Sequence, residues 1–151
     1  MIIRHFEEHD LPALTDLLRT GMAEIGATLD EEKLKRHIKP HNDESGLGLV
    51  IVIEKDVEGA AAVVIHEQFA EISQMFLSKK LRGEGKGKFL LDMLLNFSKN
   101  HDCKRVVIFL NPGMKDAIDF CKRNNFVEVA NQQNYVSYAP KDRKIPFVLE
   151  L

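Results

Sequence analysis

The amino-acid sequence predicts one mixed α/β domain over residues 1–151, and three features lead to this fold class. First, 151 residues is an ordinary length for a single domain. Second, three strand-like segments near the middle of the chain are joined by short turns, which only antiparallel neighbours allow. Third, the strand that follows them comes after a long apolar helix, which predicts a parallel βαβ crossover.

One strand and two helices are expected in the N-terminal third. Residues 1–6 are a short apolar start, typical of an edge strand. Asp10 is a good N-cap for a helix whose leucines recur at helical spacing, and Gly21 is expected to end that helix. A second helix is expected over residues 28–39, because capping-box spacing opens it and a proline follows it. Residues 41–48 are polar and contain glycine, which predicts a loop.

The middle of the chain supplies the crossover. Runs of β-branched and apolar residues predict the three antiparallel strands at residues 49–53, 59–65 and 69–77. A stretch rich in glycine and lysine, residues 79–88, leads from the third strand directly into an apolar helix at residues 89–97. This helix would return the chain to the same sheet for the next strand.

The C-terminal part is expected to complete the sheet. A strand is predicted at residues 105–110, and an Asn-Pro-Gly break separates it from a helix at residues 115–123. Closing strands are predicted at residues 126–129, 135–138 and 146–151. The proline near the start of the last strand predicts an edge position, from which it could pair or swap between two copies in a homodimer.

The composition argues against several classes of protein. The formal net charge is −2, which is unlike a dedicated nucleic-acid binder. No apolar run approaches the about 20 residues of a membrane span, and the charged N-terminus does not fit a signal peptide. Two cysteines are too few for a disulfide framework and indicate reduced thiols in a cytoplasmic protein. The six histidines are scattered without metal-site spacing, so no metal is expected.

The most informative stretch is Arg-Gly-Glu-Gly-Lys-Gly-Lys at residues 82–88, between a strand and a long helix. Alternating glycines allow outward-facing N–H groups, and the helix N-terminus adds partial positive charge. Five cations lie in or beside this loop: Lys79, Lys80, Arg82, Lys86 and Lys88. Together they predict a phosphate or pyrophosphate site, and the alternative is a solvated basic turn. The glycine spacing matches neither a Walker A loop nor a dinucleotide fingerprint.

With this loop at a strand-to-helix junction, the sequence resembles the GNAT superfamily of N-acetyltransferases. The superfamily signature is Gln or Arg, two residues, Gly, one residue, then Gly or Ala; residues 82–87 match it, and the order of elements matches over nearly the whole chain. The resemblance implies a mixed, mostly antiparallel central sheet, flanked by helices and splayed between two parallel strands. It also implies acetyl-CoA as co-substrate, bound where those strands part.

The resemblance assigns the cofactor contacts by position. Backbone groups of Met75, Phe76 and Leu77 would pair with the pantetheine arm, and the loop would hold the pyrophosphate. The loop residues implied are Arg82, Gly83, Glu84, Gly85, Lys86, Gly87 and Lys88. Asn111 follows the next strand, where it either reaches the cofactor or completes an Asn-Pro turn.

The implied reaction is attack of a neutral amine on a thioester, which needs a base, an oxyanion donor and an acid for the leaving thiolate. The tetrapeptide Phe-Ala-Glu-Ile resembles the histone-acetyltransferase branch, which implies Glu71 as the base. A solvated strand glutamate is the alternative, and His66, Glu67 and Gln74 are lesser candidates. The implied oxyanion donor is a backbone N–H near Leu77.

The acid is where the sequence departs from the superfamily. A helix there often ends in Phe-Tyr, three residues, Gly-Phe, with the Tyr hydroxyl facing the sulfur. Here Cys121 stands in the Tyr position and Asn125 in the Gly position. Cys121 is either a thiol acid or a small buried hydrophobe, and Tyr138, Tyr135 or water is the alternative acid.

The resemblance, together with the predicted anion site, implies an acetyl-CoA-dependent N-acetyltransferase acting on a primary amine, of either a small molecule or a protein. Two rival interpretations are a protein lysine or N-terminal acetyltransferase and a non-catalytic acyl-CoA-binding domain that regulates a partner. Four acidic residues on the expected acceptor side either suit a cationic acceptor or form a solvated face: Glu31, Glu32, Asp43 and Glu44.

Overall fold

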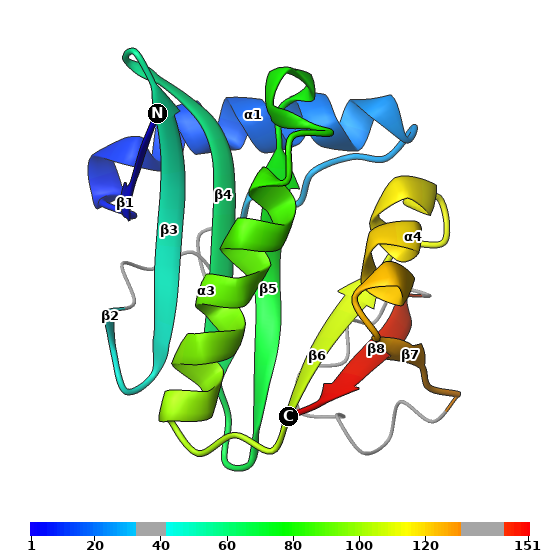
Figure 1. The fold of residues 1–151 in the computed structure, drawn as a ribbon. Coiled ribbons are helices and arrows are strands. Elements are labelled where there is room, and N and C mark those ends of the chain that lie inside the picture. Colours follow the sequence, from blue (N-terminus) through cyan, green and yellow to red (C-terminus); the bar gives the residue numbers. More distant parts are fainter. Residues whose placement is uncertain (33–41, 131–143) are drawn as a thin grey trace.

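The structure, a computed structural model, describes residues 1–32, 42–130 and 144–151. Its strands form one sheet in the order β1-β3-β4-β5-β6-β8-β7, with β2 paired to β3 (Figure 1). The strands are β1 (Ile2–His5), β2 (Asn42–Asp43), β3 (Gly46–Ile53), β4 (Asp56–Ile65), β5 (Phe69–Leu77), β6 (Arg105–Leu110), β7 (Val127–Glu128) and β8 (Ile145–Glu150). The described helices are α1 (Leu11–Glu24), α3 (Lys86–Asn100) and α4 (Lys115–Arg123), with 3-10 turns η1 (Glu8–Asp10) and η2 (Lys79–Leu81).

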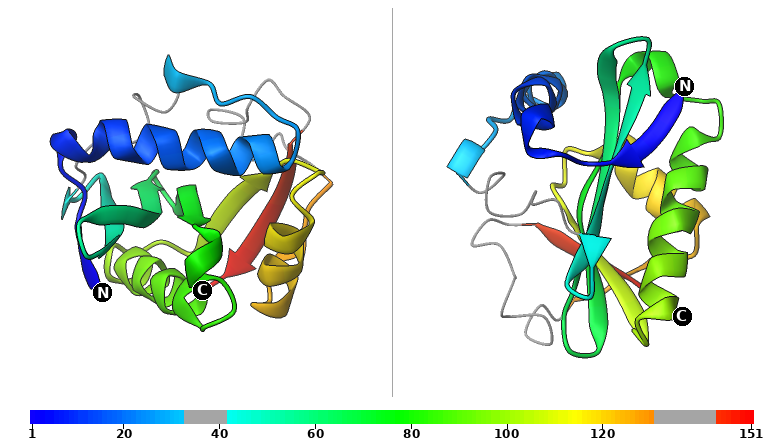
Figure 2. Two further views of the ribbon diagram at one scale, coloured as in Figure 1. Left: turned by 90° about the horizontal axis from the view of Figure 1, so that it is seen from above. Right: turned by 90° about the vertical axis from the view of Figure 1, so that its left-hand side faces the viewer.

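Helices cover both faces of this sheet. Figure 2 shows α1 on one face and α3 with α4 on the other. The larger core lies on the α3 side and includes the fully buried Leu94 and Phe147. A smaller core lies under α1, where Leu14 and Leu18 pack against Val50. Burying such a side chain contributes about 1.5–3 kcal/mol, so these two cores hold the sheet between its helix layers.

One strand pair differs from the others. β5 and β6 run parallel, connected through α3, whereas the other pairs of described strands are antiparallel. The parallel pairing covers only residues 69–71 against residues 105–107, after which the two strands diverge (Figure 1). The predicted fold class is therefore confirmed: a mixed, mostly antiparallel sheet, flanked by helices and splayed between two parallel strands.

Several elements have the predicted bounds. β5, β6 and α4 begin and end where the sequence pattern placed them. α3 begins earlier than expected, at Lys86 inside the glycine-rich loop, because Gly85 takes the N-cap position with a φ of 77°. The glycine-rich sequence therefore forms the first turn of the helix as well as the loop.

The predicted end of the first helix at Gly21 is wrong. α1 continues to Glu24, and Gly26 follows with a φ of 70°. The N–H groups of Gly26 and Ala27 donate to carbonyls of the last turn at 3.1 and 2.9 Å, which is a common glycine-terminated C-cap. Gly21 instead allows close helix–sheet packing, because a Cβ at that position would overlap the ring of Phe76.

Asp10 occupies the expected N-cap position of α1 but makes no capping bond through its side chain. Its buried carboxylate instead accepts bonds from the two terminal nitrogens of Arg4 at 2.7 and 2.8 Å, and from the Glu7 N–H at 2.8 Å. The Arg4 hydrogen bond is the largest cause that lowers the pKa of Asp10 below its ordinary value. This ion pair ties β1 to the start of α1.

The predicted loop at residues 41–48 is wrong over most of its described part. Residues 42–43 form β2, which pairs with β3, and β3 begins at Gly46, because residues 46–48 find pairing partners on β4. The second expected helix is helical at residues 31 and 32, and the rest of it lies outside the described residues. The expected strand at residues 135–138 also lies outside them.

The last strand is not an edge strand, contrary to the prediction. β8 lies between β6 and β7. The Val129 N–H donates to the Pro146 carbonyl at 3.0 Å, so the backbone of Pro146 faces the β7 side, just beyond the last residue of β7, Glu128. The missing N–H of Pro146 therefore removes no bond to β6, which explains why the sheet tolerates a proline here.

Candidate functional site

The edge of β5 becomes free where β6 diverges from it. The Ser78 N–H donates to the Glu58 carbonyl on β4 at 2.8 Å, and this bond shows toward which side residues 74–77 of β5 direct their backbone groups. By alternation along the strand, the backbone groups of Met75 and Leu77 point away from β4, into the gap beside β6. The Leu77 carbonyl supports this direction, because it accepts a bond from Arg82 Nε at 3.0 Å.

Phe76 is oriented differently from its two neighbours. Its carbonyl oxygen lies 3.2 Å from the position that a Cβ at Gly59 on β4 would take, so its backbone faces β4. Its ring packs under α1 beside Gly21. Of the three backbone contacts predicted for a pantetheine arm, the outward-facing groups therefore come from Met75 and Leu77.

Two left-handed glycines shape the loop after β5. Gly83 and Gly85 have φ values of 82° and 77°, a conformation that strains other residues. Nothing lies within 4 Å of a Cβ position at either glycine, so the space beside both is open. The Phe89 N–H donates to the Gly85 carbonyl at 3.1 Å as the first helical bond, so the N–H groups of residues 85–88 precede the helical ladder and form an anion-binding helix start.

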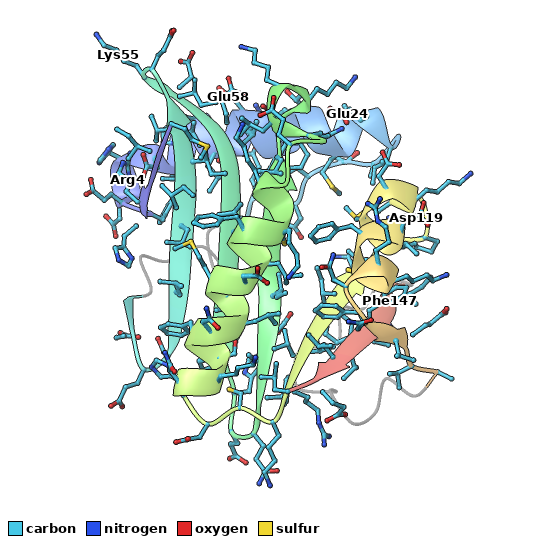
Figure 3. All side chains as sticks on the ribbon, in the orientation of Figure 1. Arg4, Glu24, Lys55, Glu58, Asp119 and Phe147 are labelled. Atoms are coloured by element: carbon cyan, nitrogen blue, oxygen red, sulfur yellow. The ribbon has the colours of Figure 1, made fainter. Side chains whose placement is uncertain are left out.

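Carboxylates accompany most of the predicted cations. Four of the five cations have a carboxylate partner: Lys80 with Glu58, Arg82 with Glu24, Lys86 with Glu84, and Lys88 with Asp92. Glu24 and Glu58 lie at the same end of the molecule as the loop (Figure 3). The attraction for an anion therefore depends on N–H groups and the helix dipole more than on net positive charge.

Arg82 joins the loop to two other elements. Besides the bond to Leu77 at the end of β5, its Nη1 donates to Glu24 Oε2 on α1 at 3.1 Å. Its guanidinium carbon also lies 5.4 Å from the centroid of the Phe76 ring. Arg82, predicted as a cofactor contact, is thus held by three contacts within the protein that fix where the loop begins.

A β-bulge in β5 determines which face Glu71 occupies. β5 pairs with β4 on both sides of Ser73, which is an extra residue without a partner on β4. Ile72 packs into the core on the α3 side, whereas Phe76 packs under α1. In a regular strand these two residues, four apart, would share a face. The bulge therefore turns Glu71 to the α1 side, the face of Gln74 and Phe76.

Glu71 lies at the fork between β5 and β6, opposite Val107, and contacts a second titratable group. Its Oε1 is 3.1 Å from His66 Nε2, and the ring of Phe69 packs on the ring of His66 with centroids 4.7 Å apart. The side chains of Glu71 and His66 are 17% and 6% exposed, unlike a solvated strand glutamate. Glu67, by contrast, is exposed in the turn. The structure thus brings together two of the candidate bases.

Cys121 lies in the core on the α3 side and is 4% exposed. Burial raises the pKa of its thiol to about 11. A thiol with this pKa is protonated at neutral pH and gives up its proton less readily than an ordinary cysteine, with a pKa of 9.0. This placement is that of a small buried hydrophobe. The other acid candidates, Tyr135 and Tyr138, lie outside the described residues.

Asn111 forms the turn that follows β6. Its Oδ1 accepts a bond from the Gly113 N–H, and its carbonyl accepts one from the Met114 N–H, both at 2.9 Å. The predicted Asn-Pro turn is therefore present. Among the acidic residues expected on the acceptor side, Glu31 pairs with Arg19 of α1.

Sequence reasoning missed two features of this region. The bulge at Ser73 has only a weak local signal, a polar Ser-Gln pair inside an apolar strand. The ion pair of Arg82 with Glu24 joins residues 58 positions apart, so no local pattern reveals it. In the described parts of the chain no group of three or more His, Cys, Asp or Glu side chains could hold a metal ion. None of the helices described there is long and apolar enough to cross a membrane.

Comparison with known sequences identifies a family. The model of the family described as the acetyltransferase (GNAT) family matches residues 11–126, well over half of the chain. A search of curated proteins finds no significant match.

Solved structures share the fold over nearly the whole chain. A GNAT-family acetyltransferase from Staphylococcus aureus Mu50 matches with a TM-score of 0.85 and 17% identity, and an acetyltransferase from Streptococcus agalactiae 2603 with 0.83 and 18%. The PaiA N-acetyltransferase from Thermoplasma acidophilum, solved in complex with coenzyme A, matches with 0.78 and 15%. Each match covers 99% of this chain and 98% of the other. At such low identities the likeness shows the fold.

Proposed function

Because the chain belongs to the acetyltransferase (GNAT) family, we propose that it transfers the acetyl group of acetyl-CoA to a primary amine by direct attack. The observation that supports this most strongly is the parting of β5 from β6 beside an anion-binding loop. The gap offers outward backbone groups for an extended amide chain, and the loop offers N–H groups for a pyrophosphate. Acetyl-CoA has both parts.

The residues present fit this co-substrate. Met75 and Leu77 would pair with the pantetheine arm as a neighbouring strand does. The N–H groups of residues 83–88 would hold the pyrophosphate, since the open space beside Gly83 and Gly85 admits it. Arg82 would keep the loop in place. Asn111 follows β6, across the gap from β5. Because its oxygens already accept the bonds of the turn, it would shape that side of the gap rather than contact the co-substrate.

Glu71 would act as the base. The amine arrives mostly as ammonium, and Glu71, enclosed at the fork, would accept its proton directly or through a water. The neutral nitrogen then attacks the thioester carbon and the carbon–sulfur bond breaks. The nitrogen gives up its second proton to solvent water, so that a neutral amide and the CoA thiolate leave. A raised pKa of about 11 makes Cys121 a poor donor to that thiolate, which leaves Tyr138 or water as the acid.

The acceptor is either a small amine or an amine of a protein. The enclosed Glu71–His66 pair favours an enzyme over a non-catalytic acyl-CoA-binding domain, because such a domain needs no base at the fork. The proposal extends to a cytoplasmic location and to pairing of two copies. A screen of small amines and peptides, scored by release of CoA, separates these acceptors.

Calorimetry with acetyl-CoA tests the proposal first, comparing the wild type with Gly85→Glu. The new side chain would place a negative charge in the open space of the loop, so that binding falls below detection. Gly26→Glu is the matched control, because Gly26 has a similar φ of 70° and open space around it but lies after α1. Tight binding by the wild type and by Gly26→Glu, lost in Gly85→Glu, would support the proposal. A folded wild type that binds no acetyl-CoA would refute it.

A further inference from the structure

Ser73, the extra residue of the β5 bulge, has a hydroxyl without a partner. Its Oγ is buried and makes no hydrogen bond. Among the buried side-chain oxygens and nitrogens of the described residues, only Ser78 Oγ shares this state. By contrast, the buried Ser98 Oγ of α3 donates to the Leu94 carbonyl at 2.8 Å. A buried hydroxyl without a partner costs free energy, so its position in a strand next to a proposed site requires an explanation.

The bulge places this residue at the fork. Ser73 lies two residues beyond Glu71, the last residue of β5 that pairs with β6. Met75 and Leu77, whose backbone groups point into the gap, follow it along the strand. At a rise of about 3.3 Å per residue, Ser73 is about 13 Å from Leu77. A pantetheine arm that pairs with this edge from the loop toward the fork would therefore bring its thioester to the bulge.

We propose that the Ser73 hydroxyl donates a hydrogen bond to the carbonyl oxygen of the bound thioester and to the oxyanion that forms from it. This inference rests on the proposed function. It places a side-chain oxyanion donor at the bulge, in addition to the backbone N–H near Leu77 that the resemblance implies. Bulges are enriched beside active sites because they redirect a side chain in this way.

The chemistry needs no proton from Ser73. When the amine nitrogen bonds to the thioester carbon, the carbonyl π electrons move onto the oxygen, and the serine O–H stabilises that negative charge as a donor. When the intermediate collapses, these electrons re-form the carbonyl and the carbon–sulfur bond breaks. The ammonium proton goes to Glu71 and the second nitrogen proton goes to solvent water, so the serine hydroxyl is unchanged after each turnover.

The hydroxyl is free to change its rotamer. In the structure no bond holds Ser73 Oγ in its enclosed position, so turning χ1 to another staggered well breaks no hydrogen bond. Ser98 differs in this respect, because its bond to Leu94 would have to break. The bulge also frees Ser73 from a partner on β4.

The test uses the fact that acetyl-CoA and CoA differ only at the thioester. Calorimetry would measure both dissociation constants for the wild type, Ser73→Ala and the control Ser78→Ala. Loss of one hydrogen bond predicts that Ser73→Ala weakens acetyl-CoA binding by about fivefold and leaves CoA binding unchanged. Ser78→Ala removes the other unpartnered hydroxyl and should change neither constant.

An infrared measurement gives an independent readout. With acetyl-CoA labelled with carbon-13 at the carbonyl, the carbonyl stretch should shift to lower frequency on binding to the wild type, since a donor polarises the bond. Ser73→Ala should lose this shift. Ser73→Thr keeps a hydroxyl and should retain both the shift and the preference for acetyl-CoA over CoA. If Ser73→Ala does not fold, Ser73→Cys, a close match in size with a weak donor, takes its place.

Four outcomes would overturn the inference. If folded Ser73→Ala binds both ligands as the wild type does, or shows the same shift of the carbonyl stretch, the hydroxyl is a by-product of the bulge and the inference alone is refuted. A parallel loss of affinity for both ligands shows a structural effect and also refutes it. A wild type that binds neither ligand refutes the proposed function together with the inference.

Discussion

The two ends of β5 differ in what surrounds them. At the fork end, residues 70 and 71 pair with both β4 and β6, and the Glu71–His66 pair is largely enclosed. At the loop end, Met75 and Leu77 pair with β4 alone, and the glycine-rich loop follows (Figure 1). Pairing on both sides holds charged side chains in fixed positions, whereas pairing on one side leaves backbone groups for a ligand. One strand can thus separate chemistry from binding along its length.

Glu71→Gln should remove the proposed base at the fork end of β5 and have the largest effect on kcat. Removing a general base lowers kcat by about 10²–10⁴-fold, because the amide cannot accept the ammonium proton. The dissociation constant for acetyl-CoA should stay unchanged, since the loop end is intact. Steady-state kinetics with an acceptor from the amine screen, together with calorimetry, measures both quantities.

Glu67→Gln is the matched control for this change. Glu67 is an exposed glutamate in the turn before β5, so its loss removes the same charge without touching the fork. Its kcat should equal that of the wild type. Equal kcat values for Glu71→Gln and the wild type would exclude Glu71 as the base.

Arg82→Ala should disturb the loop end of β5 and have an intermediate effect, on acetyl-CoA affinity rather than on kcat. The bonds of Arg82 to Leu77 and Glu24 fix the start of the loop. Without them the loop is less ordered, so acetyl-CoA binding has to supply the free energy that orders it. We expect acetyl-CoA affinity to fall by about tenfold, with kcat at saturation nearly unchanged. This is the reverse of the pattern expected for Glu71→Gln.

Arg105→Ala separates this effect from a change in net charge. Arg105 is about as exposed as Arg82, and its Nε lies 3.6 Å from Glu150 Oε1. It stands at the start of β6, away from the loop. Its substitution should leave acetyl-CoA affinity as it is. A similar loss in both variants would mean that overall charge, rather than the position of the loop, controls binding.

Cys121→Ala should alter neither end of β5, so we expect it to have the smallest effect on kcat and on acetyl-CoA affinity. Cys121 lies on the buried face of α4 and packs into the core, so kcat and acetyl-CoA affinity should change by less than about twofold. A kcat that falls tenfold or more in a folded variant would instead assign the proton to this thiol.

The same residue predicts a pH dependence of stability. The folded pKa of Cys121, about 11, exceeds the ordinary value of 9.0, so the unfolded chain ionises first as pH rises. Its contribution to the free energy of unfolding is therefore full below about pH 9 and is lost as the pH rises toward about 11. Urea unfolding of the wild type and Cys121→Ala at about pH 8 and about pH 10 should show a smaller loss in the variant.

Local patterns predicted the elements well where the pattern and the final environment agree. The apolar run of β5, the β-branched run of β6 and the amphipathic face of α4 matched the structure, because each side chain packs where its period points. They failed at Gly21, since its closeness to Phe76 comes from the helix–sheet contact. They failed at residues 46–48 and at β8 because strand pairing depends on distant segments.

The sequence by itself determined the fold class, the family resemblance and the position of the anion-binding loop, because glycine spacing and a helix start are local properties. Only the tertiary structure decided that β5 carries a bulge at Ser73, that Glu71 contacts His66, and that Cys121 is buried. Those features arise from register and packing between segments far apart in the chain. A change of one residue in register turns a strand's side chains to the other face, and a one-dimensional pattern does not record it.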